Sequence, residues 1–565
     1  MFFIALATDY DGTLAELGLV AEETLEALRQ FKRTGRKLIL VTGRELEDLK
    51  RVFSELSIFD RVVAENGALI YDPATHEART IAPPPSQLFV EALKAKNVTP
   101  LSVGHAIVAT WEPNENAVLE TIRELGLELQ IVFNKGAVMV LPPGINKATG
   151  LAAALADLEL SRHNVVAVGD AENDHAFLNA SGCAVAVANA LPMLKETADF
   201  VTMGERGAGV IELMSLLIEK DAAVVPLARH GIDIAADAAG ASVCVTPTDS
   251  VLIAGKSGIG KSTIATALTE RMVEKGLQFC VLDPEGDYLE LEGAVCIGNA
   301  KTAPAEGEVF ELLRRPDVNI VVCALAIPPA ERPAFFAKLL AKIGALRLKS
   351  GRPHWLIVDE AHHVLPSEHA GLVSPSDLPA TVLITVHPQS VQPAALKTLE
   401  VVIALGDGAG QVIAACCAAL GKFVPRVTPP GDDEVLFWRC QEAAPPKAVK
   451  PRKPRQARKR HSRKYAQGDL GPDRSFYFKG PEGALNLRAQ NLMLFVQIGE
   501  GVDDATWDHH LRAGDYSNWI RTVIKNDELA DEIAAVERDS SSEPTQSRKR
   551  ISDAILSRYT APADA

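Results

Sequence analysis

The stretch Asp9-Tyr10-Asp11-Gly12-Thr13 closes an apolar run that extends from Phe2 to Ala7. Such a run is typical of a strand buried on both faces of a parallel sheet. Because side chains alternate along a strand, Asp9 and Asp11 leave its carboxyl end on one face, and ligands of open α/β sheets bind at that end. Paired carboxylates favour Mg²⁺ between them, and a metal-held carboxylate can attack a phosphate to form an aspartyl-phosphate. The alternative is a pair of solvated loop acids.

The composition sets limits on the kind of protein this is. A chain of 565 residues predicts three or four domains, and its 47% hydrophobic and 23% charged residues are ordinary for a globular protein. We find no run of eighteen apolar residues and no basic region before the first apolar stretch, so we expect a cytoplasmic protein without a membrane span or signal peptide. A net charge of −15 argues against a chain that coats nucleic acid with its whole surface.

The eight cysteines form no C-x-x-C pair, which favours reduced thiols over disulfides or zinc. The neighbouring Cys416 and Cys417 leave a redox-active pair as the alternative.

Three further polar elements accompany predicted buried strands in the first 220 residues. The strand Lys37–Val41 delivers Thr42-Gly43-Arg44, whose hydroxyl and backbone N–H groups suit a phosphate oxygen. Lys147 precedes a predicted helix, where an ammonium group can meet a phosphate. The strand Asn164–Val168 delivers residues 169–174, Gly-Asp-Ala-Glu-Asn-Asp, whose acids can complete a metal site. We expect all of these elements at one edge of one sheet.

Residues 83–141 form a predicted insertion. Their pattern, a helix followed by two strands, occurs twice in succession, which indicates a small α+β unit. Its place in the chain predicts a lid over the site, and a plain structural insertion is the alternative.

The order of these elements resembles the haloacid dehalogenase superfamily of phosphatases. The matching residues are Asp9-x-Asp11-Gly12-Thr13, Thr42-Gly43-Arg44, Lys147 and Gly169-Asp170-x-x-Asn173-Asp174. Glu65-Asn66-Gly67-Ala68 and the duplicated insertion resemble its Cof-type subgroup (subclass IIB), which includes sugar phosphatases and phosphoglycolate phosphatases. The resemblance covers about residues 1–220.

The resemblance implies a role for each matching residue. Asp9 would be the nucleophile, and Asp11 would protonate the leaving oxygen and then activate water. The other implied roles are phosphate or substrate contacts at Thr42, Gly43, Lys147 and Asn173, and Mg²⁺ binding by Asp9, the Asp11 carbonyl, Asp170 and, through the metal's shell, Asp174.

A second module begins near residue 245. The strand Val251–Ala254 precedes residues 255–262, Gly-Lys-Ser-Gly-Ile-Gly-Lys-Ser, and a predicted helix follows. G-x-x-x-x-G-K-S in this setting predicts a P-loop, in which Lys261 reaches the β and γ phosphate oxygens and the Ser262 hydroxyl binds Mg²⁺. The predicted ATP-binding residues are Gly255, Gly258, Gly260, Lys261, Ser262 and Thr263.

A second acidic strand end completes this site. The strand Trp355–Val358 ends in Asp359, suited to a Mg²⁺ contact, and Glu360, placed to polarise the attacking water. Residues 282–288, Leu-Asp-Pro-Glu-Gly-Asp-Tyr, together with residues 359–363, Asp-Glu-Ala-His-His, resemble the HerA–FtsK branch of P-loop ATPases, many of which are ring-forming DNA translocases. The resemblance covers roughly residues 250–405 and implies ATP binding and hydrolysis.

Two features depart from that branch. Residues 221–244 leave no room for the small β-barrel that precedes the ATPase in HerA-type helicases. His387 stands where a polar sensor is expected, which leaves His387 or Gln389 as candidates. The pair His362-His363 consists of packing or sensor residues, or alternatively of metal ligands.

The remaining chain is less informative. Lys447–Lys464 is basic, contains prolines and shows no apolar periodicity, which predicts disorder. It serves either as a salt-dependent contact to nucleic acid or another anionic partner, or as a solubilising linker. In the tail we expect strands at Phe476–Phe478 and Leu492–Ile498, a helix at Trp507–Ala535 and a loose linker at Ser540–Ser547.

The sequence therefore predicts an α/β protein with two catalytic modules. We expect a Mg²⁺-dependent phosphomonoesterase that acts on a sugar phosphate or phosphoglycolate type of metabolite, joined to an ATP-hydrolysing module. Alternatives are a DNA-directed ATPase with an accessory phosphatase, and a switch in which ATP binding gates the phosphatase. The predicted divisions are a Rossmann-like haloacid dehalogenase core at 1–82 and 142–220, an α+β cap at 83–141, a linker at 221–244, a P-loop (RecA-like) ATPase domain at 245–440, a disordered linker at 441–475 and a small α+β module at 476–565.

Overall fold

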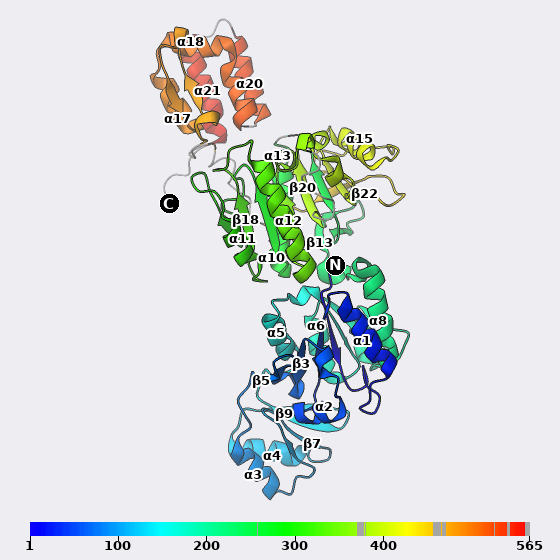
Figure 1. Ribbon diagram of the computed structural model, residues 1–565. Coiled ribbons are helices and arrows are strands. Elements are labelled where there is room, and N and C mark those ends of the chain that lie inside the picture. Colours follow the sequence, from blue (N-terminus) through cyan, green and yellow to red (C-terminus); the bar gives the residue numbers. More distant parts are fainter. Residues whose placement is uncertain are drawn as a thin grey trace.

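The computed structural model describes residues 1–256, 258–369, 378, 380–455, 465, 470–524, 526–539 and 543–559. Figure 1 shows three bodies in a row: an N-terminal unit with its cap at one end, a central unit, and a C-terminal unit at the other end. The N-terminus lies at the junction of the first two bodies. Among the described helices, none has the length and apolar character needed to span a membrane.

The N-terminal unit is built on an eight-stranded sheet of order β12-β11-β10-β1-β2-β3-β4-β5. It is parallel from β12 to β3, and β4 and β5 add an antiparallel edge. The strands are β1 (Ala5–Asp9), β2 (Lys37–Val41), β3 (Arg61–Ala64), β4 (Leu69–Asp72), β5 (Glu77–Thr80), β10 (Val165–Gly169), β11 (Cys183–Ala186) and β12 (Phe200–Val201). The helices are α1 (Glu22–Arg33), α2 (Leu46–Val52), α5 (Lys147–Asp157), α6 (His175–Ala180), α7 (Pro192–Thr197), α8 (Arg206–Lys220) and α9 (Leu227–His230).

The predicted insertion forms the cap, and its duplicated helix-strand-strand pattern is confirmed. A four-stranded antiparallel sheet of order β6-β7-β9-β8 packs against two helices over a small core that includes Phe89, Leu93 and Val118. Its elements are α3 (Gln87–Ala95), β6 (Ser102–Val103), β7 (Val108–Trp111), α4 (Glu115–Leu125), β8 (Gln130–Asn134) and β9 (Ala137–Leu141).

The central unit has an eleven-stranded sheet of order β14-β13-β23-β22-β21-β15-β20-β19-β16-β18-β17. The run from β21 to β17 is parallel, and the other four strands form an antiparallel edge. Its strands are β13 (Ile232–Ala236), β14 (Ser242–Val245), β15 (Val251–Ala254), β16 (Phe279–Asp283), β17 (Ala294–Ile297), β18 (Asn319–Cys323), β19 (Trp355–Val358), β20 (Thr381–Thr385), β21 (Val401–Leu405), β22 (Val435–Arg439) and β23 (Lys447–Pro451). Its helices are α10 (Lys261–Lys275), α11 (Glu306–Leu313), α12 (Arg332–Ser350), α13 (Ala361–Val364), α14 (Pro393–Leu396) and α15 (Ala409–Leu420).

The antiparallel edge corrects both predicted linkers. Residues 232–245, placed in the first linker, form the hairpin β13–β14, and residues 447–451, placed in the disordered one, form β23 between β22 and β13. Arg452 donates to Asp233 over 3.0 Å, and Arg455 pairs with Glu274 over 2.8 Å. Distant strands and acids supply these contacts, so local composition could not reveal them. Residues 456–464 of the basic segment lie outside the described residues.

The C-terminal unit is mainly helical. Its strands are β24 (Phe476–Phe478), as predicted, and β25 (Leu487–Ala489), followed by α17 (Leu492–Gly501), α18 (Asp504–Ala513), α19 (Asp515–Trp519), a π-helical turn at Ile520–Ile524, α20 (Asp527–Arg538) and α21 (Pro544–Arg558). The predicted strand at Leu492–Ile498 is wrong, because an apolar run alone does not separate a strand from a buried helix. Here the Asn491 side chain accepts from Leu494 N and caps a helix. The predicted loose linker also ends early, since α21 begins at Pro544.

The N-terminal and central units meet through the amino ends of their strands (Figure 1). Asn164, just before β10, donates to the carbonyl of Phe2 over 2.8 Å, and its Oδ1 lies 3.0 Å from His354 Nε2. His354, just before β19, accepts from Gln278 N through Nδ1. A Cβ on Gly351 would lie 2.3 Å from the Asn164 amide nitrogen, so glycine permits this close approach.

Candidate active sites

Three adjacent strands of the N-terminal sheet bring the predicted motifs together. The order β10-β1-β2 places Asp170, Asp9 and Thr42 side by side at the carboxyl edge of the sheet. Lys147 joins them from the first turn of α5, whose N-cap Asn146 accepts from two backbone N–H groups. The sequence-predicted residues of this module therefore lie in one site.

Lys147 is the buried cation of the site. Its side chain is 1% exposed, and its Nζ lies 2.5 Å from Asp9 Oδ1 and 2.6 Å from Asp174 Oδ1. Burial, together with the nearby Asp174 carboxylate, raises the pKa of Asp9 to about 7, although Lys147 opposes the shift. Burial alone would lower the pKa of Lys147, but the two carboxylates outweigh it and raise that pKa.

The acidic groups are arranged as a cluster that could hold a cation. Ligand oxygens of Asp9, Asp170 and Asp174 all lie within 4.8 Å of one another, and the three side chains are buried. Asp174 Oδ2 accepts from the backbone N–H groups of residues 170 and 171, at 2.9 Å each. Thr13 donates its hydroxyl to Asp170 Oδ1 over 3.2 Å. Asp174 therefore fixes the loop that carries Asp170.

Asp11 has a partner that the predicted site did not include. Arg44 holds its carboxylate in a two-pronged ion pair, with Nε 2.6 Å from Oδ2 and Nη2 2.7 Å from Oδ1. Arg44 also pairs with Asp48 over 2.6 Å. The residue follows Gly43 in the quoted Thr-Gly-Arg motif, so its position was visible in the sequence, but its partner was not.

The predicted substrate contacts lie beside the acids. Asn173 donates to Asn66 Oδ1 over 3.1 Å, and its own Oδ1 is buried with no hydrogen-bond partner among the described residues. A Cβ on Gly43 would lie 3.6 Å from the Asn173 amide, which places Gly43 against it. The Thr42 hydroxyl accepts from Arg44 N over 3.1 Å.

The side chains of Glu65 and Lys135 form hydrogen bonds between the cap and the core. Glu65, fully buried, accepts from the backbone N–H groups of His105 and Ala106 at 2.9 and 2.8 Å. Lys135, on the turn between β8 and β9, donates to the Asp11 carbonyl over 3.0 Å and to Asp170 Oδ2 over 2.8 Å. Sequence analysis missed Lys135, because an isolated lysine in a turn has no motif around it.

Comparison with known proteins agrees with this geometry. Residues 6–123 and 119–214 match the family model of haloacid dehalogenase-like hydrolases. A phosphoglycolate phosphatase from Methanothermobacter thermautotrophicus is 32% identical over 218 residues, which are 37% of this chain and 96% of the relative. The chain belongs to the haloacid dehalogenase-like hydrolases. The predicted resemblance is confirmed.

Two other relatives cover the same hydrolase unit. A phosphoglycolate phosphatase from Haloarcula marismortui is 31% identical over 219 residues, covering 37% of this chain and 95% of its own. A 5-amino-6-(5-phospho-D-ribitylamino)uracil phosphatase from Bacillus subtilis is 28% identical over 221 residues, covering 35% and 88%. The similarity to these relatives therefore covers little more than a third of the chain.

The central unit carries the P-loop between β15 and α10, in the predicted strand–loop–helix setting. Lys261, the first residue of α10, donates to the carbonyls of Gly255 and Lys256 at 2.9 and 2.8 Å. Gly258 and Gly260 have φ of +79° and +105°, a backbone that favours glycine. Ser262 is half-buried and Thr263 exposed on the first turn of the helix.

A pair of acidic residues follows β19, which lies two strands from β15 in the same sheet, with β20 between them. Asp359 is 3% exposed, and burial together with Asp287 raises its pKa well above the usual range. Glu360 follows it with φ of +41°, a left-handed backbone that is costly outside glycine and typical of functional sites. From β20, Thr385 contacts His362 Nδ1 over 3.0 Å and accepts from His387 N.

The contact between His362 and Thr385 agrees with a packing or sensor role for the histidine pair. Among the described residues, the cluster able to hold a metal ion is the one at Asp9. The exposed Gln389, the other sensor candidate, lies on a short 3₁₀ turn, Pro388–Ser390.

The neighbouring cysteines do not form a reactive pair. Cys416 and Cys417 are free and buried in α15, and burial raises the pKa of the Cys416 thiol to about 12, which disfavours a redox pair.

Residues 237–349 match the family model for the central domain of the helicase HerA. The protein therefore joins a haloacid dehalogenase-like hydrolase unit to a HerA-type ATPase domain in one chain. The match begins inside the β13–β14 hairpin, which agrees with the corrected domain boundary.

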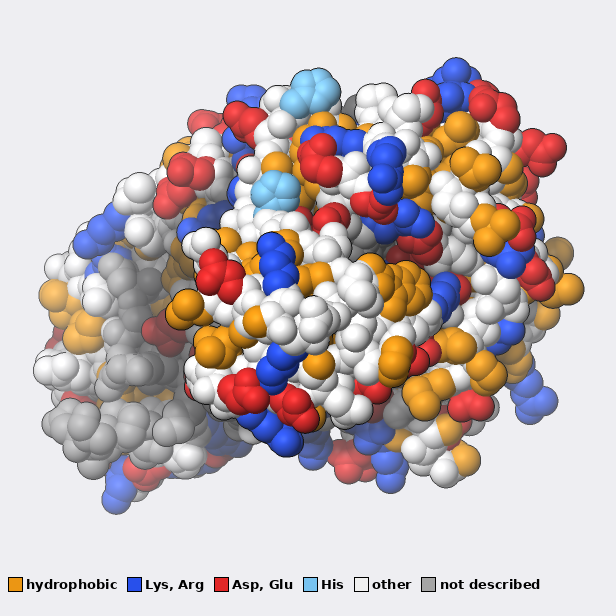
Figure 2. Space-filling model, turned by 90° about the horizontal axis from the view of Figure 1, so that it is seen from below, with side chains coloured by type: hydrophobic (Ala, Val, Ile, Leu, Met, Phe, Trp, Pro, Cys, Tyr) orange, Lys and Arg blue, Asp and Glu red, His pale blue; other side chains and the backbone are white. Residues whose placement is uncertain are grey.

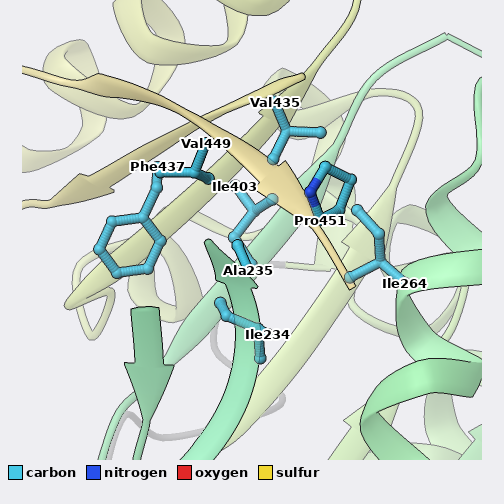
Figure 3. A pocket seen from close by; sticks show the side chains of 8 residues that line it. All are labelled: Ile234, Ala235, Ile264, Ile403, Val435, Phe437, Val449 and Pro451. Atoms are coloured by element: carbon cyan, nitrogen blue, oxygen red, sulfur yellow. The ribbon is translucent and has the colours of Figure 1, made fainter. Parts of the chain in front are cut away.

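The surfaces away from these sites are less distinctive. Figure 2 shows basic and acidic side chains interspersed over the face seen from below. Figure 3 shows an apolar pocket in the ATPase domain, lined by side chains from its antiparallel edge, β21 and α10. Its eight lining residues include no charged or hydroxyl-bearing side chain, so it carries none of the chemistry described above.

Proposed function

We propose that the hydrolase unit is a Mg²⁺-dependent phosphomonoesterase that acts on a small phosphorylated metabolite through an aspartyl-phosphate. The observation that carries the proposal is the buried Asp9 carboxylate, held by Lys147 within the acidic cluster. Relatives named as phosphoglycolate phosphatases and as a phosphatase of a phosphorylated ribityl compound support a small sugar phosphate or phosphoglycolate type of substrate.

The residues present fit a hard divalent cation. Carboxylates of Asp9 and Asp170 and the carbonyl of Asp11 would hold it, and Asp174 keeps the Asp170 loop in place. Once bound, Mg²⁺ would neutralise phosphate charge that otherwise repels the nucleophile.

The chain's own residues supply the remaining steps. Asp9 attacks phosphorus while Lys147 and Thr42 hold phosphate oxygens. Asp11 protonates the leaving oxygen and then activates the water that hydrolyses the aspartyl-phosphate. Arg44 donates hydrogen bonds to both Asp11 carboxylate oxygens in this structure. This ion pair therefore has to break before the Asp11 carboxyl group can transfer a proton.

Removal of the metal tests this proposal. We expect chelation with EDTA to abolish phosphate release from 2-phosphoglycolate or a sugar phosphate, and added Mg²⁺ to restore it, because the carboxylate cluster then lacks its counter-charge. Continuous phosphate detection across a panel of phosphomonoesters measures this. Unchanged turnover in EDTA contradicts the proposal, and Ca²⁺, with its larger and looser coordination shell, serves as the control ion.

We also propose that the HerA-type domain binds and hydrolyses ATP. Lys261 would contact the β and γ phosphates, Ser262 and Asp359 would hold Mg²⁺, and Glu360 would polarise the attacking water. Whether DNA stimulates this activity stays a prediction. DNA-dependent ATP hydrolysis by a ring-shaped oligomer would favour the DNA-directed alternative.

The junction supports a second candidate function, in which nucleotide binding gates the phosphatase. Asn164 precedes the strand that carries Asp170, and its partner His354 precedes the strand that carries Asp359. Arg352, 1% exposed, also donates to the carbonyl of Glu159 across the junction over 2.7 Å. Both acidic sites therefore stand on strands that begin at one buried hydrogen-bonded interface.

The histidines of this junction predict acid sensitivity. His163 and His230 are buried with ring centroids 5.3 Å apart, and burial lowers their pKa values to about 3 and about 4. Unfolded histidine titrates near 6.5, so below that pH the unfolded chain binds protons that the folded chain refuses. The free energy of unfolding should fall by ~1.4 kcal/mol per pH unit and per histidine between about pH 6.5 and 4.

Denaturant titrations from pH 8 to 4 measure this slope. The variant His163→Phe, which keeps an aromatic ring in the contact, should lose one histidine's share of the slope. A stability that stays level from pH 6.5 to 5 in the wild type would contradict the expectation.

A further inference from the structure

The tip of the cap hairpin holds a lysine in a costly backbone conformation. Asn134 pairs with Ala137, which leaves Lys135 and Gly136 as a two-residue turn. Both have positive φ, +48° and +86°, as in a type I′ turn. Such turns favour asparagine, aspartate or glycine, and a strained side chain at a ligand site often has a role in binding.

The side chain of Lys135 reaches from the cap into the core site. Its Nζ contacts the Asp11 carbonyl and Asp170 Oδ2, and a Cβ on Gly12 would lie 2.7 Å from it. The side chain is 49% exposed, whereas that of Lys147 is 1% exposed. Lys135 is therefore a cation at the solvent-facing mouth of the site.

Its present contacts conflict with the metal. The Asp11 carbonyl and the Asp170 carboxylate are also the proposed Mg²⁺ ligands, and an ammonium group that shares an oxygen with a divalent cation is repelled by it. Lys135 therefore has to leave Asp170 when the metal binds. Its backbone belongs to the turn between β8 and β9 of the cap. In-line attack by Asp9 puts the leaving group on the far side of phosphorus from Asp9, and we infer that this side faces the cap.

We propose that Lys135 determines specificity by binding a carboxylate on the leaving group of the substrate, and that it exchanges Asp170 for this carboxylate as metal and substrate bind. The inference rests on the proposed phosphatase function. The other two cations of the site are engaged elsewhere: Lys147 lies between Asp9 and Asp174, where it would hold the phosphate, and Arg44 keeps its ion pair with Asp48 when Asp11 parts from it. A neutral leaving group would leave the displaced ammonium beside the metal without a counter-charge.

A pair of closely matched esters tests the specificity. 2-Phosphoglycolate carries the carboxylate, and 2-hydroxyethyl phosphate replaces it with a neutral alcohol. In Lys135→Met, kcat/KM for 2-phosphoglycolate should fall about 10- to 100-fold, the worth of one charge-assisted hydrogen bond, and that for 2-hydroxyethyl phosphate by less than about threefold. Lys135→Arg should recover most of the loss, and Lys94→Met, at an exposed lysine of α3, should change neither ester.

Equal losses for both esters would show that Lys135 binds the phosphoryl group, and would overturn the proposal, as would no loss for either. A second readout needs no turnover. Calorimetric Mg²⁺ titration without substrate should give tighter binding to Lys135→Met by about three- to tenfold, because a competing cation is gone. Unchanged Mg²⁺ affinity would overturn the exchange.

Failure of the proposed function is separable from failure of this inference. Wild type that releases phosphate from no member of the phosphomonoester panel refutes the phosphatase assignment alone. In that case, the Mg²⁺ titration and the calorimetric affinity for 2-phosphoglycolate, compared between wild type and Lys135→Met, still decide the role of Lys135. Equal affinities for 2-phosphoglycolate would overturn it.

Discussion

We expect Asp9→Asn to abolish phosphate release: kcat should fall by at least about 10⁴-fold while the protein stays folded. An amide oxygen cannot form the aspartyl-phosphate, but it can still accept the hydrogen bond from Lys147 that Asp9 accepts over 2.5 Å. The change also removes a carboxylate from a cluster of buried acids, so we expect little loss of stability. Phosphate release across a panel of phosphomonoesters and a thermal melt measure both effects.

A matched control comes from the same acidic motif. Glu172 is exposed, next to Ala171 and Asn173, and Glu172→Gln should keep wild-type turnover. Substantial turnover in Asp9→Asn, with phosphate still released from the substrates that wild type prefers, would refute Asp9 as the nucleophile. Loss of turnover accompanied by loss of the folded state would require the same comparison at lower temperature.

The second large effect is expected at the P-loop. Lys261→Ala should abolish ATP hydrolysis, with kcat/KM lower by about 10³-fold or more, because the point charge beside the β and γ phosphates is lost. In this structure the Lys261 ammonium donates to two carbonyls of its own loop, at 2.9 and 2.8 Å. In Lys261→Ala these two carbonyl groups lose their hydrogen-bond donor and would be hydrated or would contact the ligand instead. ATP hydrolysis and calorimetric nucleotide binding measure the change.

Two further variants sharpen this result. Lys256 lies in the same loop and pairs at the surface with Asp407 over 2.8 Å. Lys256→Ala therefore removes an equal charge from the loop and should lower kcat/KM for ATP far less than Lys261→Ala does. Glu360→Gln should keep nucleotide binding and lose hydrolysis. Slow residual ATP hydrolysis that Glu360→Gln leaves unchanged would refute the role of Glu360 and would support a domain that binds ATP with little turnover.

The same variants distinguish two independent activities from a gated one. If Lys261→Ala retains full phosphatase activity, the two modules work independently. If it also silences the phosphatase, nucleotide binding gates the hydrolase unit, and the Asn164–His354 contact is the connection to disrupt next. In that case Asn164→Leu should uncouple phosphatase turnover from ATP.

The sequence alone was enough to predict the two modules and the strand ends at which their candidate site residues lie. Asp9, Thr42 and Asp170 each follow a short apolar strand, and Lys261 follows a glycine loop after another. These patterns are local, because a short apolar run followed by polar residues is enough to predict a buried strand with a polar end. Parallel strands bring their carboxyl ends to one edge of the sheet whatever lies between them in the sequence. The cap's duplicated pattern could be predicted for the same reason.

The tertiary structure alone decided what joins those parts. The β13–β14 hairpin and β23 became one edge of the ATPase sheet, because their pairing partners lie about two hundred residues apart. Lys135 meets Asp170, Arg44 grips Asp11, and Asn164 meets His354 for the same reason. A hydrogen bond or ion pair between distant residues depends on how whole sheets and caps pack, and no periodicity or spacing within either segment encodes its partner.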